Sequence, residues 1–100
     1  MEIHEFISSK FQAGRSLDEQ QQTMDGLGAA VSEQPGFVSR ECFYSEADDR
    51  WLVHIVWEDE EALERSEAMA SDPEVAKLYE GFAVDQMRYA RYERRERGTS

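Results

Sequence analysis

The chain has 100 residues, of which 40 % are hydrophobic and 33 % are charged. This length suits one domain with its own core, and this composition is typical of soluble globular proteins. The formal net charge of −11 argues against a nucleic-acid partner, because an acidic surface repels phosphates. The longest apolar run, Leu52–Trp57, contains a histidine and is too short to span a bilayer, so we expect no membrane partner.

Cysteine usage and the N-terminus bear on the cell compartment. Cys42 is the single cysteine of the chain, so no disulfide can staple the fold. No basic, apolar and small-residue succession of a signal peptide is visible at the N-terminus. We therefore expect a cytoplasmic protein.

The charge is distributed unevenly along the chain. Residues 1–87 hold 6 basic and 20 acidic residues, whereas residues 88–100 hold 5 basic and 2 acidic residues. The basic cluster consists of Arg88, Arg91, Arg94, Arg95 and Arg97. We interpret it as the end of a last strand followed by a flexible basic tail at residues 94–100, which offsets the acidic body. An electrostatic docking patch is the alternative.

The N-terminal third predicts a strand followed by a helix. Residues 2–11 alternate imperfectly between apolar and polar side chains, which favours a strand. Ser16 and Glu19 have the spacing of a capping box, so a helix should begin here and continue to about residue 34. One apolar stripe along it consists of Leu17, Met24, Leu27 and Val31.

Residues 35–63 predict a β-hairpin that runs directly into a second helix. A Pro-Gly turn precedes two strand-forming runs, Phe37–Ser45 and Arg50–Trp57, which the polar residues 46–49 join. One face should pair Tyr44 with Trp51, Cys42 with Val53, Arg40 with Ile55, and Val38 with Trp57. The opposite face should pair Phe43 with Leu52, Glu41 with His54, and Ser39 with Val56.

The remaining elements complete a known topology. Asp59 should cap the second helix, and Asp72-Pro73 should restart a short helical turn, because proline suits the first helical position. Residues 84–93 should form the last strand. The order β-α-β-β-α-β predicts an α+β, ferredoxin-like fold, with one antiparallel sheet and its helices on one face.

The sheet face away from the helices raises the question of oligomeric state. It would carry Phe43, Leu52 and Val56 into water, and monomers seldom expose such an apolar patch. Packing two sheets face to face would bury it. We therefore predict a homodimer through sheet-to-sheet packing.

The topology and two motifs resemble the antibiotic-biosynthesis monooxygenase family of dimeric α+β barrels. The motifs are Pro35-Gly36-Phe37 and Trp57-Glu58-Asp59-Glu60-Glu61-Ala62-Leu63, with Asp72-Pro73 as a further match. The resemblance covers about residues 2–93 and implies one domain at residues 1–93. The family that the chain resembles includes cofactor-free oxygenases of polycyclic phenols, haem-degrading enzymes and other proteins on the same barrel.

The resemblance implies a role for Trp57, because oxygenases of anthrone-type phenols carry a tryptophan there. Those enzymes have an asparagine where Val53 stands and a tyrosine where Leu63 stands, so two of their polar groups are missing here. The haem degraders use an asparagine on the first strand, a tryptophan in the second helix and a later histidine. None of these is present, since no histidine follows His54. We expect no haem, no other cofactor and no metal.

Three charged or titratable residues of the hairpin are candidates for catalysis. Arg40 is the one charge on the apolar face, so we expect a carboxylate partner or a place in a cavity, where it would hold an anion. A Glu41 carboxylate beside His54 would favour the imidazolium and orient the ring as a general base, and a structural polar pair is the alternative. His4 could approach them if the first strand neighbours the third. The two histidines and Glu41 could then ligate a metal ion, although nothing in their spacing requires it.

Aromatic residues and the cysteine complete the set of candidates. Trp57 could stack on a planar substrate or serve as a core aromatic. Tyr44, Trp51, Tyr79 and Phe82 could wall an aromatic pocket or simply pack. Cys42 is interpreted as a core thiol rather than a nucleophile.

The leading hypothesis is a cofactor-independent monooxygenase of a small aromatic or polyketide-like substrate, with one pocket per subunit between helices and sheet. The predicted catalytic residues are His54, Glu41 and Arg40, and the predicted substrate-binding residues are Trp57, Tyr44, Trp51, Tyr79 and Phe82. The alternative is a non-oxygenase protein on the same barrel that binds a small molecule or acts as an isomerase or cyclase. A purely structural homodimer is the third hypothesis.

Overall fold

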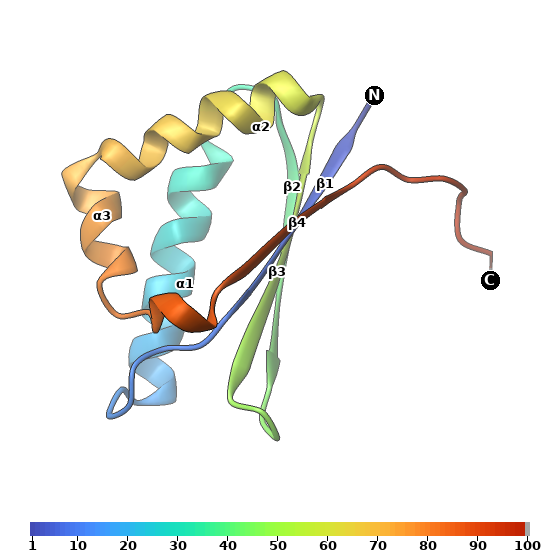
Figure 1. Cartoon of the computed structure of the whole chain (residues 1–100). Coiled ribbons are helices and arrows are strands. Elements are labelled where there is room, and N and C mark those ends of the chain that lie inside the picture. Colours follow the sequence, from blue (N-terminus) through green and yellow to red (C-terminus); the bar gives the residue numbers. More distant parts are fainter. Residues whose placement is uncertain (100) are drawn as a thin grey trace.

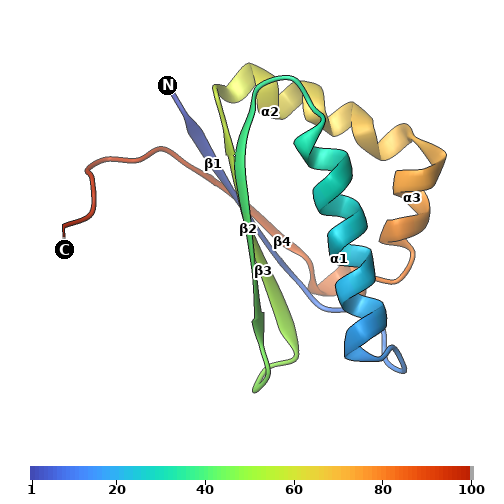
Figure 2. The same ribbon diagram turned by 180° about the vertical axis from the view of Figure 1, so that it is seen from behind.

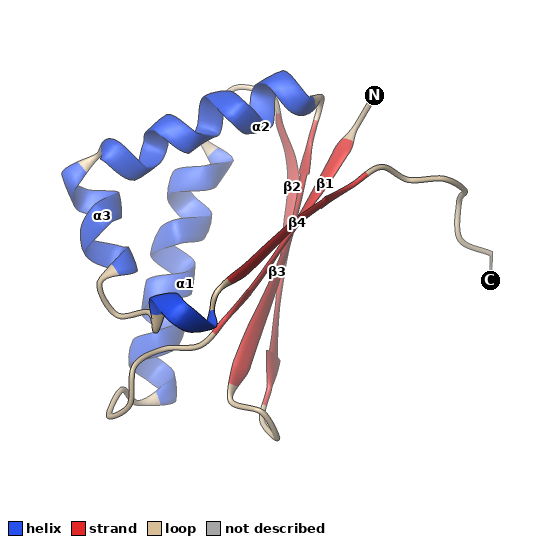
Figure 3. Ribbon diagram, viewed as in Figure 1, coloured by secondary structure: helices blue, strands red, loops and turns tan. Residues whose placement is uncertain are grey.

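An antiparallel sheet with helices on one face forms the fold in the computed structural model, which describes residues 1–99 (Figures 1 and 3). The strands are β1 Ile3–Ser9, β2 Phe37–Ser45, β3 Arg50–Trp57 and β4 Arg88–Tyr92, in the spatial order β2-β3-β1-β4. The helices are α1 Leu17–Ser32, α2 Glu60–Ser66 and α3 Pro73–Tyr79, with short 3₁₀ turns η1 Glu67–Ser71 and η2 Val84–Gln86. The predicted α+β, ferredoxin-like class is confirmed.

The first helix begins at the predicted capping box. The Ser16 hydroxyl accepts a hydrogen bond from the Glu19 backbone N–H at 3.1 Å, and the Ser16 N–H donates to the Glu19 carboxylate at 3.2 Å. The apolar stripe differs at its start, because the first helical residue, Leu17, is 50 % exposed. Gln20 is buried instead, since its side-chain oxygen accepts a hydrogen bond from the Trp51 indole N–H at 2.9 Å.

The hairpin has the predicted bounds and, for most of its length, the predicted register. Tyr44 faces Trp51 and Glu41 faces His54. The predicted pairing of Val38 with Trp57 is wrong, because an irregularity between residues 37 and 39 lets Phe37 take that position. This β-bulge inserts one extra residue into β2.

The first and the last strand of the chain are shorter than predicted. The first strand ends at Ser9 rather than residue 11, and Phe11 forms an isolated bridge with Phe82. The last strand begins at Arg88 rather than residue 84, because residues 84–86 form η2. Residues 93–99 form neither helix nor strand, and Ser100, the end of the predicted basic tail, lies outside the described residues.

The helical layer covers the sheet unevenly. The Asp59 carboxylate accepts from the Ala62 N–H at 2.8 Å and starts α2, and Asp72 caps α3 in the same way, as predicted. Helix α1 packs against β2, whereas α3 packs against α1 and η1 (Figure 2). No helix among residues 1–99 is long and apolar enough to cross a membrane.

The sheet face away from the helices is only partly exposed. Phe43 is 51 % and Leu52 is 39 % exposed, in line with the predicted apolar patch. The predicted exposure of Val56 is wrong, since this side chain is 7 % exposed. Val56 lies on an inner strand between His4 on β1 and Ser39 on β2, and these neighbours shield it.

The Pro-Gly turn before β2 allows a direct test of the packing between β2 and α2. Gly36 has a φ of +85°, and a Cβ there would overlap the Cβ of the buried Ala62, whereas Gly14 has a φ of +93° and open space around it. We expect Gly14→Ala to cost about 1 kcal/mol of unfolding free energy from backbone strain alone. Gly36→Ala should cost about 3 kcal/mol, because overpacking adds to the strain. Urea denaturation measures both losses, and equal losses would contradict the packing described here.

Candidate active site between the helices and the sheet

A cavity of about 690 Å³ lies between the sheet and the helical layer. Its sheet wall consists of Glu5 and Ile7 on β1, Ile55 and Trp57 on β3, and Tyr89, Ala90 and Arg91 on β4. Its helical wall consists of Val31, Ser66, Glu67, Met69, Ala70, Ala76 and Tyr79. Eight of these 14 side chains are apolar, and six carry polar groups, so the cavity combines an apolar body with polar groups as small-molecule sites do.

Strand alternation places a carboxyl group in the sheet wall of this cavity. Ile3, Glu5 and Ile7 share the inner face of β1, and Glu5 faces Ile55 on β3 and Arg91 on β4. The Trp57 indole N–H donates a hydrogen bond to Oε1 of Glu5 at 3.1 Å. Because Trp57 is 1 % exposed, this bond fixes the carboxyl group against a rigid core side chain.

The surroundings of Glu5 change its acidity. Burial, the largest influence, raises the pKa of this carboxyl above the ordinary value of 4.5. The hydrogen bond from Trp57 and the charge of Arg91 lower the pKa, and the charge of Glu67 raises it, but burial prevails. Glu5 is therefore a better proton acceptor than a surface carboxylate when it is ionised.

An ion-pair bridge spans the edge of the cavity. Arg91 on β4 contacts Glu67 on η1 at 2.7 Å and Glu60 on α2 at 3.4 Å. All three side chains are substantially exposed, so the bridge adds little to stability. It does link the edge strand to the helical layer where Arg91 and Glu67 line the cavity.

Two tyrosines face the cavity from opposite walls. Tyr79 comes from α3 and is half-buried, and Tyr89 comes from β4 and lies at the exposed rim. Burial raises the pKa of Tyr79 above the ordinary value of 10, and partial burial together with the Glu5 charge raises the pKa of Tyr89. Both phenols therefore stay protonated at neutral pH and can donate hydrogen bonds.

The structure separates the predicted aromatic residues into two groups. Trp57 and Tyr79 line the cavity, whereas Tyr44, Trp51 and Phe82 are not among its lining residues. The Tyr44 hydroxyl donates to Asp49 at 2.7 Å at the hairpin tip, and Trp51 bonds Gln20 in the core. Phe82 is buried and stacks on Phe11.

The structure places Arg40 beneath α1 rather than in the cavity wall. Its guanidinium donates to the Met24 carbonyl of α1 at 3.2 Å, in space that Gly28 leaves free. Among residues 1–99, no carboxylate forms an ion pair with it. The expected carboxylate partner is therefore replaced by a helix carbonyl.

His54 and Glu41 lie on the other face of the sheet, away from the cavity. They are cross-strand neighbours as predicted, and β1 neighbours β3, so His4 does reach His54, with 2.8 Å between Nδ1 of His4 and Nε2 of His54. The His54 ring also stacks on Phe6 at 4.4 Å between ring centroids. Among residues 1–99, Nε2 of His4 is buried without a hydrogen-bond partner, and no three potential ligands lie close enough to hold a metal ion.

The predicted effect of Glu41 on the histidine is outweighed. Burial, followed by the charges of His4 and Arg94, lowers the pKa of His54 below the ordinary value of 6.5, although Glu41 acts in the opposite direction. The neutral imidazole is therefore favoured, and the expected preference for imidazolium is wrong. The stability that this neutral form gives is complete above pH 6.5 and is lost as pH falls through the lowered pKa.

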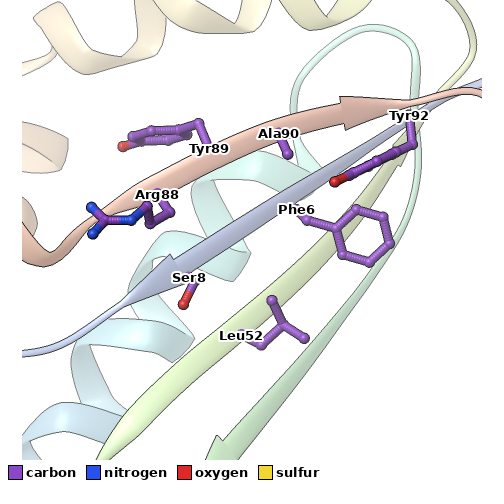
Figure 4. Close-up of a pocket in the computed structure, with 7 residues that line it drawn as sticks. All are labelled: Phe6, Ser8, Leu52, Arg88, Tyr89, Ala90 and Tyr92. Atoms are coloured by element: carbon purple, nitrogen blue, oxygen red, sulfur yellow. The ribbon is translucent and has the colours of Figure 1, made fainter.

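A second, shallower hollow of about 510 Å³ lies on this far face. Its lining residues are Phe6, Ser8, Leu52, Arg88, Tyr89, Ala90 and Tyr92. Figure 4 shows the Tyr92 ring beside the Phe6 ring, with Ser8 on the same strand as Phe6 and Leu52 on the neighbouring strand β3. The hollow has apolar and aromatic walls but carries no acidic group.

Glu5 was not among the candidates predicted from the sequence. The available signal was its position between Ile3 and Ile7 on the apolar side of β1. A carboxyl group on a buried strand face needs a partner or a function. Cys42, by contrast, fits its prediction as a core thiol, because burial raises its pKa.

Comparisons with known proteins agree with the resemblance found in the sequence. The sequence model of the family described as "Antibiotic biosynthesis monooxygenase" matches residues 5–71. Among curated proteins, none matches the chain significantly.

Several solved structures share the fold. SnoaB, a cofactor-independent oxygenase from Streptomyces nogalater, has a TM-score of 0.80 at 18 % identity, covering 96 % of this chain and 95 % of that one. At3g17210 from Arabidopsis thaliana has a TM-score of 0.75 at 12 % identity, with 97 % and 99 % covered. Rv0793 from Mycobacterium tuberculosis has a TM-score of 0.73 at 8 % identity, with 99 % and 100 % covered.

The raised pKa of Glu5 predicts a pH-dependent effect of Glu5→Gln on stability. The folded state holds this proton more tightly than the unfolded state, so the wild type loses stability as pH rises above 4.5. The amide imitates the neutral carboxyl, so the melting temperature of the variant minus that of the wild type should be near zero at low pH and become positive as pH rises. Thermal denaturation at several pH values measures this difference, and Glu64→Gln on the surface of α2 is the control. A difference that stays constant or turns negative would contradict the partly buried position of Glu5.

The cross-strand neighbours on the far face predict a shift in a histidine titration. Because the Glu41 charge raises the pKa of His54 against the other influences, Glu41→Gln should lower that pKa further. Nuclear magnetic resonance titration of the imidazole protons measures the change, with Glu64→Gln as the control. An unchanged or higher pKa would show that the two side chains do not interact.

Proposed function

The chain belongs to the antibiotic biosynthesis monooxygenase family, and on that basis we propose that it is a cofactor-independent oxygenase of a small aromatic or polyketide-like substrate. The substrate binds in the cavity between the sheet and the helical layer. Trp57 and Tyr79 are the two predicted substrate-binding residues that line this cavity. The half-buried Tyr79 makes the principal aromatic contact, and Trp57, which is 1 % exposed, holds the Glu5 carboxyl group through its indole N–H. The protein supplies orientation and a largely apolar enclosure, and molecular oxygen is the second substrate.

The main support for this proposal comes from the size of the cavity and the groups that line it. A volume of about 690 Å³ has room for a fused-ring compound and lies in the usual range of ligand sites. It combines the Trp57 ring system, the Glu5 carboxyl group and the Tyr79 phenol in one space. These groups suit a planar substrate that passes through an anion.

The reaction balances without a further reductant or oxidant. A substrate methylene group that is flanked by aromatic rings loses one proton, and the resulting carbanion transfers one electron to molecular oxygen. The two radicals combine to a peroxide anion, which takes up a proton. Loss of the second methylene proton and cleavage of the O–O bond then give a carbonyl group and water. The Tyr79 hydroxyl donates a hydrogen bond to the oxygen on which the substrate anion places its charge.

The cavity contains polar groups although Val53 and Leu63 replace two polar residues of the family pattern. Val53 and Leu63 are buried in the core and are not among the residues that line it. The polar groups come instead from β1 and β4 on the sheet side and from α2, η1 and α3 on the helical side. SnoaB, with which the chain shares its fold at 18 % identity, is a cofactor-independent oxygenase, so the proposed reaction is one that this fold accommodates.

We also propose that two copies of the chain pack through the far face of the sheet. Phe43 and Leu52 on this face are exposed, and the hollow beside them has apolar and aromatic walls (Figure 4). A second copy would cover this surface by sheet-to-sheet packing.

The single free thiol of the chain, Cys42, suits the proposed cytoplasmic location.

Oxygen uptake by the metal-stripped protein tests the proposed reaction. With a panel of anthrone-type and hydroquinone substrates, we expect uptake above the buffer blank, and Tyr79→Phe should lower kcat/KM by about 100-fold, because it removes a donor to the anion. Tyr44→Phe is the matched control, since that hydroxyl contacts Asp49 outside the cavity. Saturable binding without uptake for every substrate would contradict oxygenation and favour the binding or isomerase alternative.

Light scattering after size-exclusion chromatography tests the proposed dimer. Phe43→Asp should shift the mass from that of two chains to that of one, because it places a charge in the seam between the sheets. Leu17→Asp is the control, since Leu17 is equally exposed but lies on α1, away from this face. A wild-type mass of one chain, or a dimer that survives Phe43→Asp, would contradict the proposed interface.

A further inference from the structure

We propose that Glu5 accepts the proton whose removal starts the reaction, and that the cavity therefore selects carbon or oxygen acids that are uncharged when they bind. This inference rests on the proposed function and adds to it the base and the charge of the substrate. It follows from the position of the carboxyl group, its hydrogen bonding and the other groups in the cavity.

The geometry leaves one oxygen of Glu5 free for proton transfer. Oε1 accepts the hydrogen bond from the Trp57 indole N–H at 3.1 Å, and no hydrogen bond to Oε2 is present among residues 1–99. The indole has a single N–H, so this bond orients the carboxyl group without occupying its second oxygen. A substrate in the cavity is thereby placed next to a free carboxylate oxygen, while the buried Trp57 holds the other oxygen in position.

The charges around Glu5 favour a base of useful strength. Arg91 on β4 and Glu67 on η1 face it with opposite charges, while Tyr79 on α3 and Tyr89 on β4 are neutral phenols. Burial raises the pKa of Glu5 despite Arg91 and the Trp57 hydrogen bond. A carboxylate with a raised pKa gains more on protonation, which favours proton abstraction near neutral pH.

No other titratable group in the described cavity wall can take this role as well. Glu67 has an exposed side chain and is ion-paired with Arg91 at 2.7 Å. The raised pKa values of Tyr79 and Tyr89 keep both phenols protonated. Both histidines lie on the opposite face of the sheet, so the predicted base His54 does not face this cavity.

The same groups define the charge of the substrate. A ligand that arrives as an anion would meet Glu5 and Glu67, and the cavity's cation, Arg91, is already paired with a carboxylate. A neutral acid meets no such repulsion, and the apolar walls favour a flat hydrophobic body. When Oε2 of Glu5 takes the proton, the electron pair of the broken bond stays on the substrate. The charge thus leaves the buried carboxyl group and spreads over the substrate rings beside the Tyr79 hydroxyl.

Hydrogen exchange without oxygen tests the base separately from oxygenation. Anthrone and other neutral carbon acids are incubated under argon in deuterated buffer, and loss of the methylene proton signal is followed by nuclear magnetic resonance. The wild type should accelerate exchange above the buffer blank. Glu5→Gln should lower the enzymatic exchange rate by at least about 100-fold, because an amide cannot accept the proton. Glu64→Gln, an exposed carboxylate on α2 outside the cavity, should exchange at the wild-type rate.

Binding and pH dependence separate a chemical role from a structural one. Tryptophan fluorescence should show that Glu5→Gln still binds the neutral acid, since the amide oxygen can keep the Trp57 hydrogen bond. The wild-type exchange rate should rise with pH until Glu5 is ionised and then level off, whereas the residual rate of Glu5→Gln should follow the hydroxide concentration. If Glu5→Gln fails to fold, Glu5→Asp should retain the titration at a reduced rate.

The outcomes distinguish this proposal from the proposed function. Exchange at the wild-type rate in folded Glu5→Gln, or no acceleration by the wild type with any carbon acid of the panel, would overturn Glu5 as the base. Exchange that depends on Glu5, together with no oxygen uptake in air, would overturn the oxygenase and leave the base in place. Oxygen uptake that persists in Glu5→Gln would support the oxygenase and overturn Glu5.

Discussion

The hydrogen bond from the Trp57 indole to the Glu5 carboxylate, at 3.1 Å, is the interaction on which the site depends. It joins the two inner strands of the sheet on the face that the helices cover, and it holds a charged group where apolar side chains would otherwise pack. Burying such a group is costly unless a partner compensates, and here a single N–H and the charge of Arg91, which is itself paired with Glu67, give only part of that compensation. The raised pKa of Glu5 results from this incomplete compensation, and it gives the cavity its chemical character.

The two faces of the sheet carry different chemistry because strand alternation sorts the residues of β1 and β3. The inner face holds Glu5 and Trp57 next to a cavity, and the outer face holds the His4–His54 pair next to a shallow hollow. The uneven helical layer explains why the inner face has room for a ligand: α3 packs on α1, and the sheet near β4 stays open to the cavity. A helix that lay flat on all four strands would fill this space.

The fold could be predicted closely from the sequence, because its signals are local. The capping box at Ser16, the Pro-Gly turn and the acid caps at Asp59 and Asp72 each satisfy or redirect the backbone within a few residues. The bulge after Phe37 could not be predicted, because no glycine or other residue typical of bulges stands at this position. The site was harder to predict, because its residues come from strands and helices that are far apart in the sequence and meet only in the folded structure. Arg40 has the pattern of a cavity residue, yet the carbonyl of Met24 accepts its hydrogen bond. Glu5 belongs to no motif, its one signal in the sequence is its position between Ile3 and Ile7, and the assembled sheet places it in the cavity wall.

The proposed function requires that an aromatic substrate binds between the sheet and the helical layer, beside Glu5. A crystal structure with anthraquinone, a flat and unreactive analogue of an oxidised product, tests this claim most directly. We expect the ring system in the inner cavity beside Glu5, with a carbonyl oxygen that accepts a hydrogen bond from the Tyr79 hydroxyl. A ring system seated instead in the outer hollow over Phe6 and Leu52, with the inner cavity filled by solvent, would contradict it.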